Sequence, residues 1–209
     1  MQLSKEIGIT QKSAWFVLQR LREACGKDLT MLSGLVEIDE TYIGGKEKSK
    51  HASKKLNAGR GAVGKTAVVG MRERGGRTKA KVIANVNAGS LHQAIIENIE
   101  VGSLLNTDEH AGYGGLDGIF YQHETINHSA GEYVRDGVNT NSIESVWAVL
   151  KRGLHGIYHH ASEKHLSRYV DEFTFRLNDG NVGRHTISRL DSFVEATAGR
   201  RITYKELIA

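Results

Sequence analysis

Three acidic residues far apart along the chain are candidates for metal-assisted chemistry. Asp39 lies near the middle of a strand-like run, Asp108 lies at the end of another, and Glu144 lies in the first turns of an amphipathic helix. Carboxylates brought together repel one another and are costly to desolvate unless a cation compensates them. Mg²⁺ or Mn²⁺ suits an all-oxygen site, and two such ions roughly 3.5–4 Å apart can activate an attacking oxygen at a phosphodiester. The three acids therefore predict a two-metal site if the fold brings them together.

Each acid also has a simpler interpretation. Asp39 could only form a salt bridge with a lysine, and Asp108 could only cap the turn that follows it. Glu144 could be one half of an exposed Glu–Lys arrangement. Spacing alone leaves both interpretations open.

The elements that must position these acids predict an α/β fold with a mixed sheet flanked by helices. Strand-like runs are expected at residues 35–39, giving way to Tyr42-Ile43-Gly44-Gly45, and at residues 66–71, 79–87, 104–108 and 120–126. Helices are expected after Ser90, after Asn139 or Thr140, and after Ser162. Asp39 then lies near the middle of the first strand and Asp108 at the carboxyl end of the fourth, where open α/β sheets place their ligands.

The helix that contains Glu144 has the clearest pattern in the chain. Its apolar positions recur at helical spacing, namely Ile143, Val146, Trp147 and Leu150. Glu144 shares a separate stripe with Asn141 and Lys151. Trp147 is accordingly expected in the core rather than as a platform for stacking bases.

A helix-turn-helix pattern precedes the first strand. Leu3 and Ile7 fit a short helix, Gly8 breaks it, and Thr10 caps a second helix with Ala14, Val17, Leu18 and Leu21 inward. The second helix presents Gln11, Lys12, Ser13 and Trp15 outward, where a recognition helix meets base edges or phosphates. Helical hairpins without DNA are common, so this pattern alone does not decide the partner.

Positive charge is concentrated in one block of a chain whose net charge is only +4. Between Lys46 and Lys81 there are 12 Lys and Arg against Glu47 and Glu73. Such a block favours a polyanion, because each cation that meets a phosphate releases a condensed counterion. The alternative is a solvated loop whose lysines serve solubility. The candidate DNA contacts in this block are Lys46, Lys48, Lys54, Lys55 and Arg60.

Several functional classes are excluded or disfavoured. Cys25 is the only cysteine, which excludes an internal disulfide and a zinc site built from paired cysteines. His155 and His159 are one helical turn apart, but no cysteine or acid stands at matching spacing for zinc. No apolar run could span a bilayer, and the first residues lack the apolar stretch of a signal peptide. A cytoplasmic protein without a membrane partner is expected.

Three sequence blocks resemble those of DDE transposases of bacterial insertion sequences. They are VEIDETYIGG around Asp39, LLNTDEHAGY around Asp108 and NTNSIESVWAVLKRGLHGIYHH around Glu144. The 35 residues between Asp108 and Glu144 are a spacing typical of many DDE enzymes and retroviral integrases. Asn141, three residues before the last acid, and the run HLSRYVDEFTFRLN resemble one subgroup. The likeness covers about Leu3 to Asn178.

The resemblance implies an RNase H-like fold with a mixed five-stranded sheet, preceded by a helix-turn-helix. A partial DNA-binding segment at 1–30, a catalytic domain at 31–180 and a C-terminal extension at 181–209 are then expected. Asp39, Asp108 and Glu144 would ligate two Mg²⁺ or Mn²⁺ ions, with Asn141 as an auxiliary contact. Lys151 and Arg152 would meet the DNA backbone.

The function that the resemblance implies is metal-dependent DNA cleavage and strand transfer at element ends. The partners would be terminal inverted repeats and target DNA, bound by a homodimer or higher oligomer. Relatives in the subgroup often carry a cysteine-rich zinc ribbon before the helix-turn-helix, and this sequence has no cysteine pair there. Two alternatives stay open: a truncated, catalytically silent DNA-binding remnant, and an RNase H-like nuclease without strand transfer.

Overall fold

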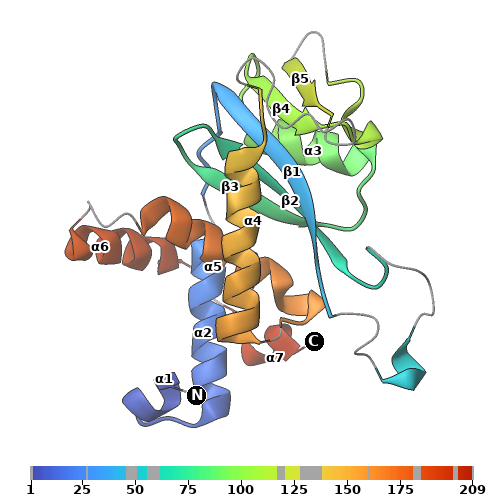
Figure 1. Ribbon diagram of the computed structural model, residues 1–209. Helices are drawn as coiled ribbons and strands as arrows, with labels where there is room; N and C mark the ends of the chain where they lie inside the picture. Colours follow the sequence, from blue (N-terminus) through green and yellow to red (C-terminus); the bar gives the residue numbers. More distant parts are fainter. Residues whose placement is uncertain are drawn as a thin grey trace. The chain divides into compact units, whose positions relative to one another are not determined.

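The computed structural model divides the chain into two compact units (Figure 1). One unit comprises residues 29–170, and the other combines residues 1–28 with residues 171–209. The expected division into three segments stays a prediction, although the first and last of those segments belong to the same unit. The structure describes residues 2–26, 28–45, 51–55, 62–116, 121–127, 138–159, 161–180, 185–199 and 202–208.

The larger unit contains the mixed five-stranded sheet that the sequence predicts. Its strands are β1 (Leu35–Ile43), β2 (Thr66–Glu73), β3 (Thr78–Ile83), β4 (Leu104–Asp108) and β5 (Gln122–Ile126), in the order β3-β2-β1-β4-β5. β1 pairs antiparallel with β2 and parallel with β4, so it is the central strand. β2 and β3 are antiparallel, whereas β4 and β5 are parallel. The expected five-stranded mixed sheet flanked by helices is confirmed.

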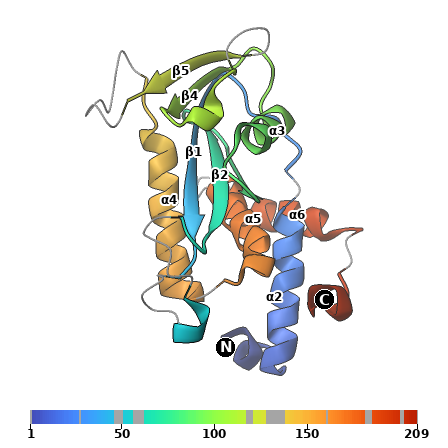
Figure 2. The same cartoon turned by 90° about the vertical axis from the view of Figure 1, so that its right-hand side faces the viewer.

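Two helices cover opposite faces of this sheet (Figure 2). Helix α3 (Ala88–Asn98) packs on the apolar face, and helix α4 (Asn141–Gly153) packs on the other. The core under α3 is formed by fully buried side chains from three strands and the helix, including Val36, Ile38, Val69, Met71, Leu91, Ile95 and Leu105. Because side chains alternate along a strand, Glu37 and Asp39 of β1 point to the α4 face.

Local signals placed most of these elements correctly. The apolar stripe of α4 is confirmed, since Ile143, Val146, Trp147 and Leu150 are all buried. The expected cap of α3 is wrong by one turn. β3 ends at Ile83, and Asn87 caps the helix by accepting a hydrogen bond from the backbone N–H of Ser90 at 2.9 Å. A π-helical turn, η5 (Leu154–Tyr158), follows α4 directly.

The smaller unit is helical. It contains α1 (Gln2–Glu6), α2 (Gln11–Cys25), α6 (Thr186–Thr197), α7 (Tyr204–Ile208) and the second half of α5 (Glu163–Asp179). Thr10 caps α2 as predicted, accepting from the N–H of Ser13 at 3.2 Å. Cys25 is buried, as expected. No helix of the described residues is long and apolar enough to cross a membrane.

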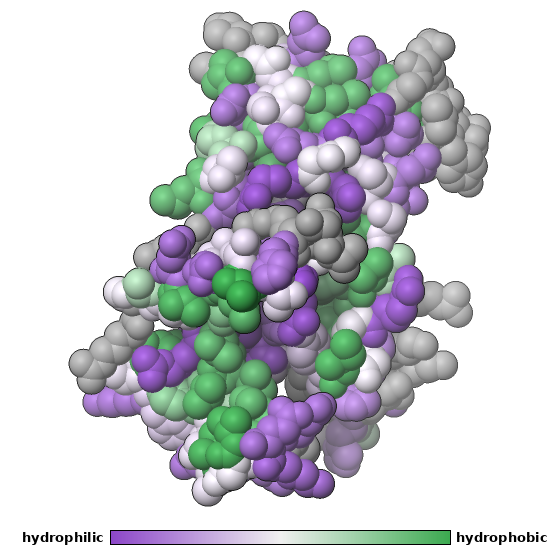
Figure 3. Space-filling model, turned by 90° about the vertical axis from the view of Figure 1, so that its left-hand side faces the viewer, coloured by the Kyte–Doolittle hydropathy of each residue, from purple (hydrophilic) through white to green (hydrophobic). Residues whose placement is uncertain are grey.

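The inward face of α2 differs from the predicted one. Ala14 is buried, but Val17, Leu18 and Leu21 are only half-buried, while Arg22 is 6% exposed. The reason is an ion pair within this unit, since Arg22 Nε donates to Glu172 Oε2 of α5 at 2.7 Å. On the face that Figure 3 presents, apolar side chains gather over the helices of this unit. Exposed apolar residues of α6 are Ile187, Leu190 and Val194.

Candidate functional site

Asp39 and Asp108 come together on neighbouring parallel strands. The register of β1 and β4 pairs Glu37 with Asn106, two residues before Asp39 and Asp108, and the charge of Asp108 acts on Asp39. Both side chains lie on the α4 face. Side chains two positions apart along a strand share a face, so Asp39 lies on the face of Glu37 and Asp108 on that of Asn106. The side chain of Asn106 lies on this face, because its Nδ2 donates to the carbonyl of Asn139, two residues before α4 begins.

Asp39 has the most perturbed carboxyl group of this site. The pKa of Asp39 is raised to about 7, mainly by burial and in addition by the negative charges of Glu40 and Asp108. Two hydrogen bonds act in the opposite direction: Trp147 Nε1 donates to Oδ2 at 2.9 Å, and the N–H of Glu40 donates to Oδ1 at 2.8 Å. A nearby cation would favour the ionised carboxylate and lower this pKa.

A glycine in the neighbouring strand makes the contact between Trp147 and Asp39 possible. Gly70 of β2 lies directly opposite Asp39 in the antiparallel register. A Cβ atom at this position would lie 2.5 Å from two ring atoms of Trp147 and 2.9 Å from Cδ1 of Ile143. The indole therefore lies against the bare backbone of β2 while its N–H reaches β1. Trp147 is in the core as predicted, with a hydrogen bond that the apolar stripe did not indicate.

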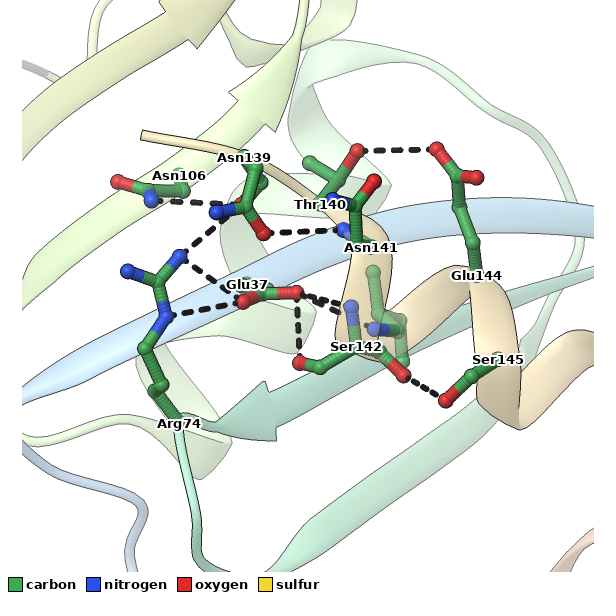
Figure 4. A network of polar contacts seen from close by, with 10 residues as sticks. Glu37, Arg74, Asn106, Asn139, Thr140, Asn141, Ser142, Glu144 and Ser145 are labelled. Atoms are coloured by element: carbon green, nitrogen blue, oxygen red, sulfur yellow. Dashed lines mark hydrogen bonds and ion pairs between the residues drawn. The ribbon is translucent and has the colours of Figure 1, made fainter. Parts of the chain in front are cut away.

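Glu37 holds the start of α4 against the central strand (Figure 4). Its Oε2 accepts from the N–H of Ser142 at 2.8 Å, from Ser142 Oγ at 2.6 Å and from the N–H of Ile143 at 3.2 Å. Arg74 Nη2 donates to the other oxygen, Oε1, at 3.0 Å. This buried carboxylate satisfies backbone donors of the first turn and complements the positive end of the helix dipole. Strand β1 thus holds α4 at two points, through Glu37 and through Asp39.

Sequence reasoning missed Glu37 as a structural contributor. The available signal was its position in the alternating pattern of the strand. Glu37 lies between the apolar Val36 and Ile38 and shares its side of the strand with Asp39. A charged residue in the middle of a strand that is otherwise buried requires a partner. The identity of that partner, the first turn of a helix more than 100 residues later, could not be read from the sequence.

Glu40 contributes charge near Asp39 from the opposite side of β1. Its Oε2 accepts from the hydroxyl of Tyr113 at 2.7 Å. Tyr113 is buried in the core under α3, and burial together with the charge of Glu40 raises the pKa of its hydroxyl. Glu40 is therefore held on the α3 face, although it follows Asp39 in the sequence.

The carboxylates of Asp108 and Glu144 have other contacts besides the proposed site. Asp108 Oδ1 accepts from the N–H of His110 at 3.0 Å, so this residue also caps the turn that follows β4. Glu144 is exposed, and its Oε1 accepts from Thr140 Oγ1 at 3.2 Å, one helical turn back (Figure 4). Within the described part of the chain, no three His, Cys, Asp or Glu side chains are grouped closely enough to hold a metal ion. The structure brings the two aspartates close enough for their charges to interact and leaves Glu144 exposed on α4.

The other predicted contact residues are largely on the surface. Asn141, Lys151 and Arg152 are exposed on α4, and Gln11, Lys12 and Ser13 are exposed at the start of α2. Lys55 is exposed as well. Lys46, Lys48 and Arg60 lie outside the described residues, as does the side chain of Lys54.

Comparisons with known proteins agree on the class of the chain. The sequence model described as "ISXO2-like transposase domain" matches residues 31–178. A curated relative from Halobacterium salinarum, described as an uncharacterized protein in transposable element ISH50, is 29% identical over 185 residues. That match covers 84% of this chain and 63% of the relative, so the chain spans less than two thirds of the relative's length.

Solved structures with a similar arrangement include two retroviral integrase domains. The catalytic core domain of BIV integrase gives a TM-score of 0.45 at 14% identity, covering 78% of this chain and 95% of that one. The catalytic core domain of HTLV-2 integrase, in complex with magnesium, gives a TM-score of 0.41 at 14% identity, covering 79% and 99%.

Proposed function

Because the chain belongs to the family of ISXO2-like transposase domains, we propose that it cleaves DNA at element ends and transfers the strands to target DNA. Divalent metal ions held by Asp39, Asp108 and Glu144 support this chemistry. The observation that carries the proposal is the proximity of Asp39 and Asp108 on the face covered by α4, where the charge of Asp108 acts on Asp39. The helix that supplies Glu144 is fastened to the same strand by Glu37 and Trp147.

The donor set fits Mg²⁺ or Mn²⁺. Carboxylate oxygens are the ligands that these hard cations prefer. The pKa of Asp39 is raised by burial and by neighbouring negative charges, which are the two effects that a bound cation offsets. Bound metal supplies activation of water or a 3′ hydroxyl and stabilisation of the leaving oxygen. Glu144 is the third ligand in this proposal, and its carboxylate must exchange the hydroxyl of Thr140 for the metal.

The remaining residues of the site orient these groups and the DNA. Trp147 fixes one oxygen of Asp39, and Glu37 fixes the N-terminal turn of α4. Asn141 is an auxiliary contact to metal, water or phosphate, and Lys151 and Arg152 contact the DNA backbone. At least two protomers act together, since two element ends must be processed. A cytoplasmic location is part of this proposal.

The test is cleavage of a supercoiled plasmid that carries the DNA flanking the gene, with Mn²⁺ or Mg²⁺ present. We expect nicking by the wild type, and a loss of about a thousandfold or more in Asp39→Asn, Asp108→Asn and Glu144→Gln, since metal coordination supplies several kcal/mol of transition-state stabilisation. Glu97→Gln is the matched control, because Glu97 lies on α3 and pairs with Lys81. Retained cleavage in any of the three site variants would refute the assignment.

Thr140→Val sharpens the test of Glu144. Thr140 is buried and valine has nearly its shape, so the substitution removes chiefly the hydroxyl that now binds Glu144. If Glu144 acts as a metal ligand, Thr140→Val keeps cleavage while Glu144→Gln loses it. Equal losses in both variants would indicate that Glu144 serves only the start of α4.

A catalytically silent DNA-binding protein is the second candidate. The contacts of Glu144 with Thr140 and of Asp108 with His110 favour it, because both carboxylates have structural partners. This candidate predicts duplex binding with no Mn²⁺-dependent rise in melting temperature and no nicking. Nicking without joining of strands would instead indicate a nuclease of the same fold.

A further inference from the structure

Cationic and aromatic side chains alternate along one side of α2 in the smaller unit. Lys12 Nζ lies 4.7 Å from the ring centroid of Tyr204, and Arg20 Cζ lies 5.7 Å from that of Phe16. The two rings meet edge to face, with centroids 5.7 Å apart and an interplanar angle of 78°. Lys12, Phe16 and Arg20 are spaced by four residues and share one side of the helix. We call these four residues the α2/α7 row.

The C-terminal helix is firmly attached where it contributes Tyr204. Leu207 of α7 is fully buried. Thr203 and Glu206 form a reciprocal cap: Glu206 Oε2 accepts from the N–H of Thr203 at 2.6 Å, and Thr203 Oγ1 accepts from the N–H of Glu206 at 3.3 Å. Tyr204 therefore has a defined place against α2.

The two cations of the row have no acidic partner among the described residues. Other cations of the same unit do: Glu172 binds Arg22 at 2.7 Å and Arg176 at 2.7 Å. Lys12 and Arg20 are exposed, and their contacts within the described chain are the faces of the aromatic rings. A cation over an aromatic face gains a modest attraction to the ring and loses part of its conformational freedom. These charges are ordered and still able to meet an external anion.

We propose that the α2/α7 row binds the phosphate backbone of duplex DNA and that the C-terminal helix is part of this interface. The identity of the polyanion as DNA rests on the proposed function. One face of each ring is covered by a cation, and the two rings also cover each other edge to face. The rings hold the cations and are poor platforms for unpaired bases, which distinguishes this row from a surface for single strands.

Binding of the full-length chain to a labelled 30-base-pair duplex of random sequence, followed by fluorescence anisotropy in EDTA, tests the two cations. Lys12→Gln and Arg20→Gln are each expected to weaken binding about 3- to 10-fold near physiological salt. Each also lowers the slope of log K against log salt by roughly 1, because one phosphate contact is lost. Arg176→Gln is the matched control: it removes the same charge from the same unit, where Glu172 already neutralises it. We expect its binding within about twofold of wild type.

Tyr204 is tested without any change of charge. Tyr204→Phe retains the ring and is expected to bind like the wild type, whereas Tyr204→Leu retains apolar packing only and is expected to bind about 2- to 5-fold more weakly. Thermal melting shows whether each variant is folded. Wild-type affinity and slope in a Lys12→Gln/Arg20→Gln double variant would overturn the proposal, as would an equal loss in Arg176→Gln or unchanged binding in Tyr204→Leu.

Two further outcomes separate this proposal from related ones. A single-stranded 30-mer that binds as tightly and depends equally on Tyr204 would overturn the assignment to duplex phosphates. Because binding is measured without divalent metal, failure of the cleavage proposal leaves the effects of Lys12 and Arg20 intact. If the α2/α7 row proves not to bind DNA, metal-dependent nicking by the wild type is still expected.

Discussion

The two faces of the central sheet differ sharply although the same strands build both. Under α3, β1 contributes Val36 and Ile38, which are fully buried in an apolar core. Under α4, the same strand contributes Glu37 and Asp39, each bound to that helix. One face stabilises the fold by removing apolar surface from water, and the other keeps a carboxyl group where its ionised form is disfavoured.

A small domain can in this way separate the residues that stabilise it from the residues that carry its chemistry. Alternation along β1 places a core residue and a site residue next to each other in sequence but on opposite sides of the sheet. A change on the α3 face should therefore act on the free energy of unfolding, and a neighbouring change on the α4 face should act on charge and metal binding. The substitutions below test that separation.

Ile38→Ala should have the largest effect on stability. Ile38 is fully buried under α3, and truncation leaves a cavity that costs about 2–5 kcal/mol. Urea unfolding measures the loss, with Val149→Ala on the exposed side of α4 as the control at about 0.5 kcal/mol or less. A loss as small as that of the control would contradict the assignment of Ile38 to the core.

Gly70→Ala should follow, at about 1–3 kcal/mol, because the new methyl group meets the ring of Trp147. The indole must then move away from Asp39, so plasmid nicking should fall along with the near-ultraviolet circular dichroism of tryptophan. Gly153→Ala is the control, since a Cβ atom there meets nothing within 4 Å. If both alanines behave alike, the close fit of Gly70 and Trp147 has no energetic role.

Asp39→Asn should change stability in the opposite direction, and only at higher pH. The pKa of Asp39 is raised from 3.8 to about 7 in the folded chain, so its contribution to stability is complete below about pH 4 and is lost as the pH rises through 7. Without metal, the asparagine variant should be about 3–4 kcal/mol more stable than wild type at pH 8, and nearly equal to it at pH 4. Melting curves in EDTA at several pH values measure this difference.

The same measurement with Mn²⁺ should reverse the order of the two proteins. Bound cation stabilises the ionised carboxylate, so the melting temperature of the wild type should rise at pH 8 and that of Asp39→Asn should not. Glu97→Gln is the control, because Lys81 and Gln93 lower the pKa of Glu97 and removal of its charge brings no gain at high pH. A pH-independent difference between wild type and Asp39→Asn would contradict the raised pKa.

Trp147→Phe should have the smallest effect, about 1 kcal/mol, since it keeps the aromatic packing and removes one N–H donor. That donor favours the ionised form of Asp39, so its loss should raise the pKa of Asp39 further and weaken Mn²⁺ binding at pH 7. Isothermal titration calorimetry with Mn²⁺ measures this change. Trp15→Phe, a substitution in the smaller unit, should leave Mn²⁺ affinity unchanged.

Much of the fold followed from local patterns because burial repeats with the period of each element. The five strands, the apolar stripe of α4 and the cap of α2 at Thr10 all rest on residues a few positions apart. The sequence also offered Asp39, in the middle of the first strand, and Asp108, at the end of the fourth, as acids that could converge. The positions of these carboxylates on one face then follow from strand alternation.

What the sequence could not indicate are contacts between distant segments. The bond of Glu37 to the N-terminus of α4, the fit of Trp147 against Gly70 and the packing of Tyr204 on α2 each join residues more than 70 positions apart. The present contact of Glu144 with Thr140 is local, but whether Glu144 meets the aspartates depends on how α4 lies on the sheet.

Local sequence patterns determine which segments become strands and helices, and they identify the acids that are candidate metal ligands. The folded chain sets how far each of those acids is shielded from water and which hydrogen bonds hold it, and it brings a ring of α7 against α2. The physical reason is that periodic burial is encoded within each segment. Register, helix docking and the desolvation of a carboxylate, by contrast, depend on the atoms that other segments bring to it.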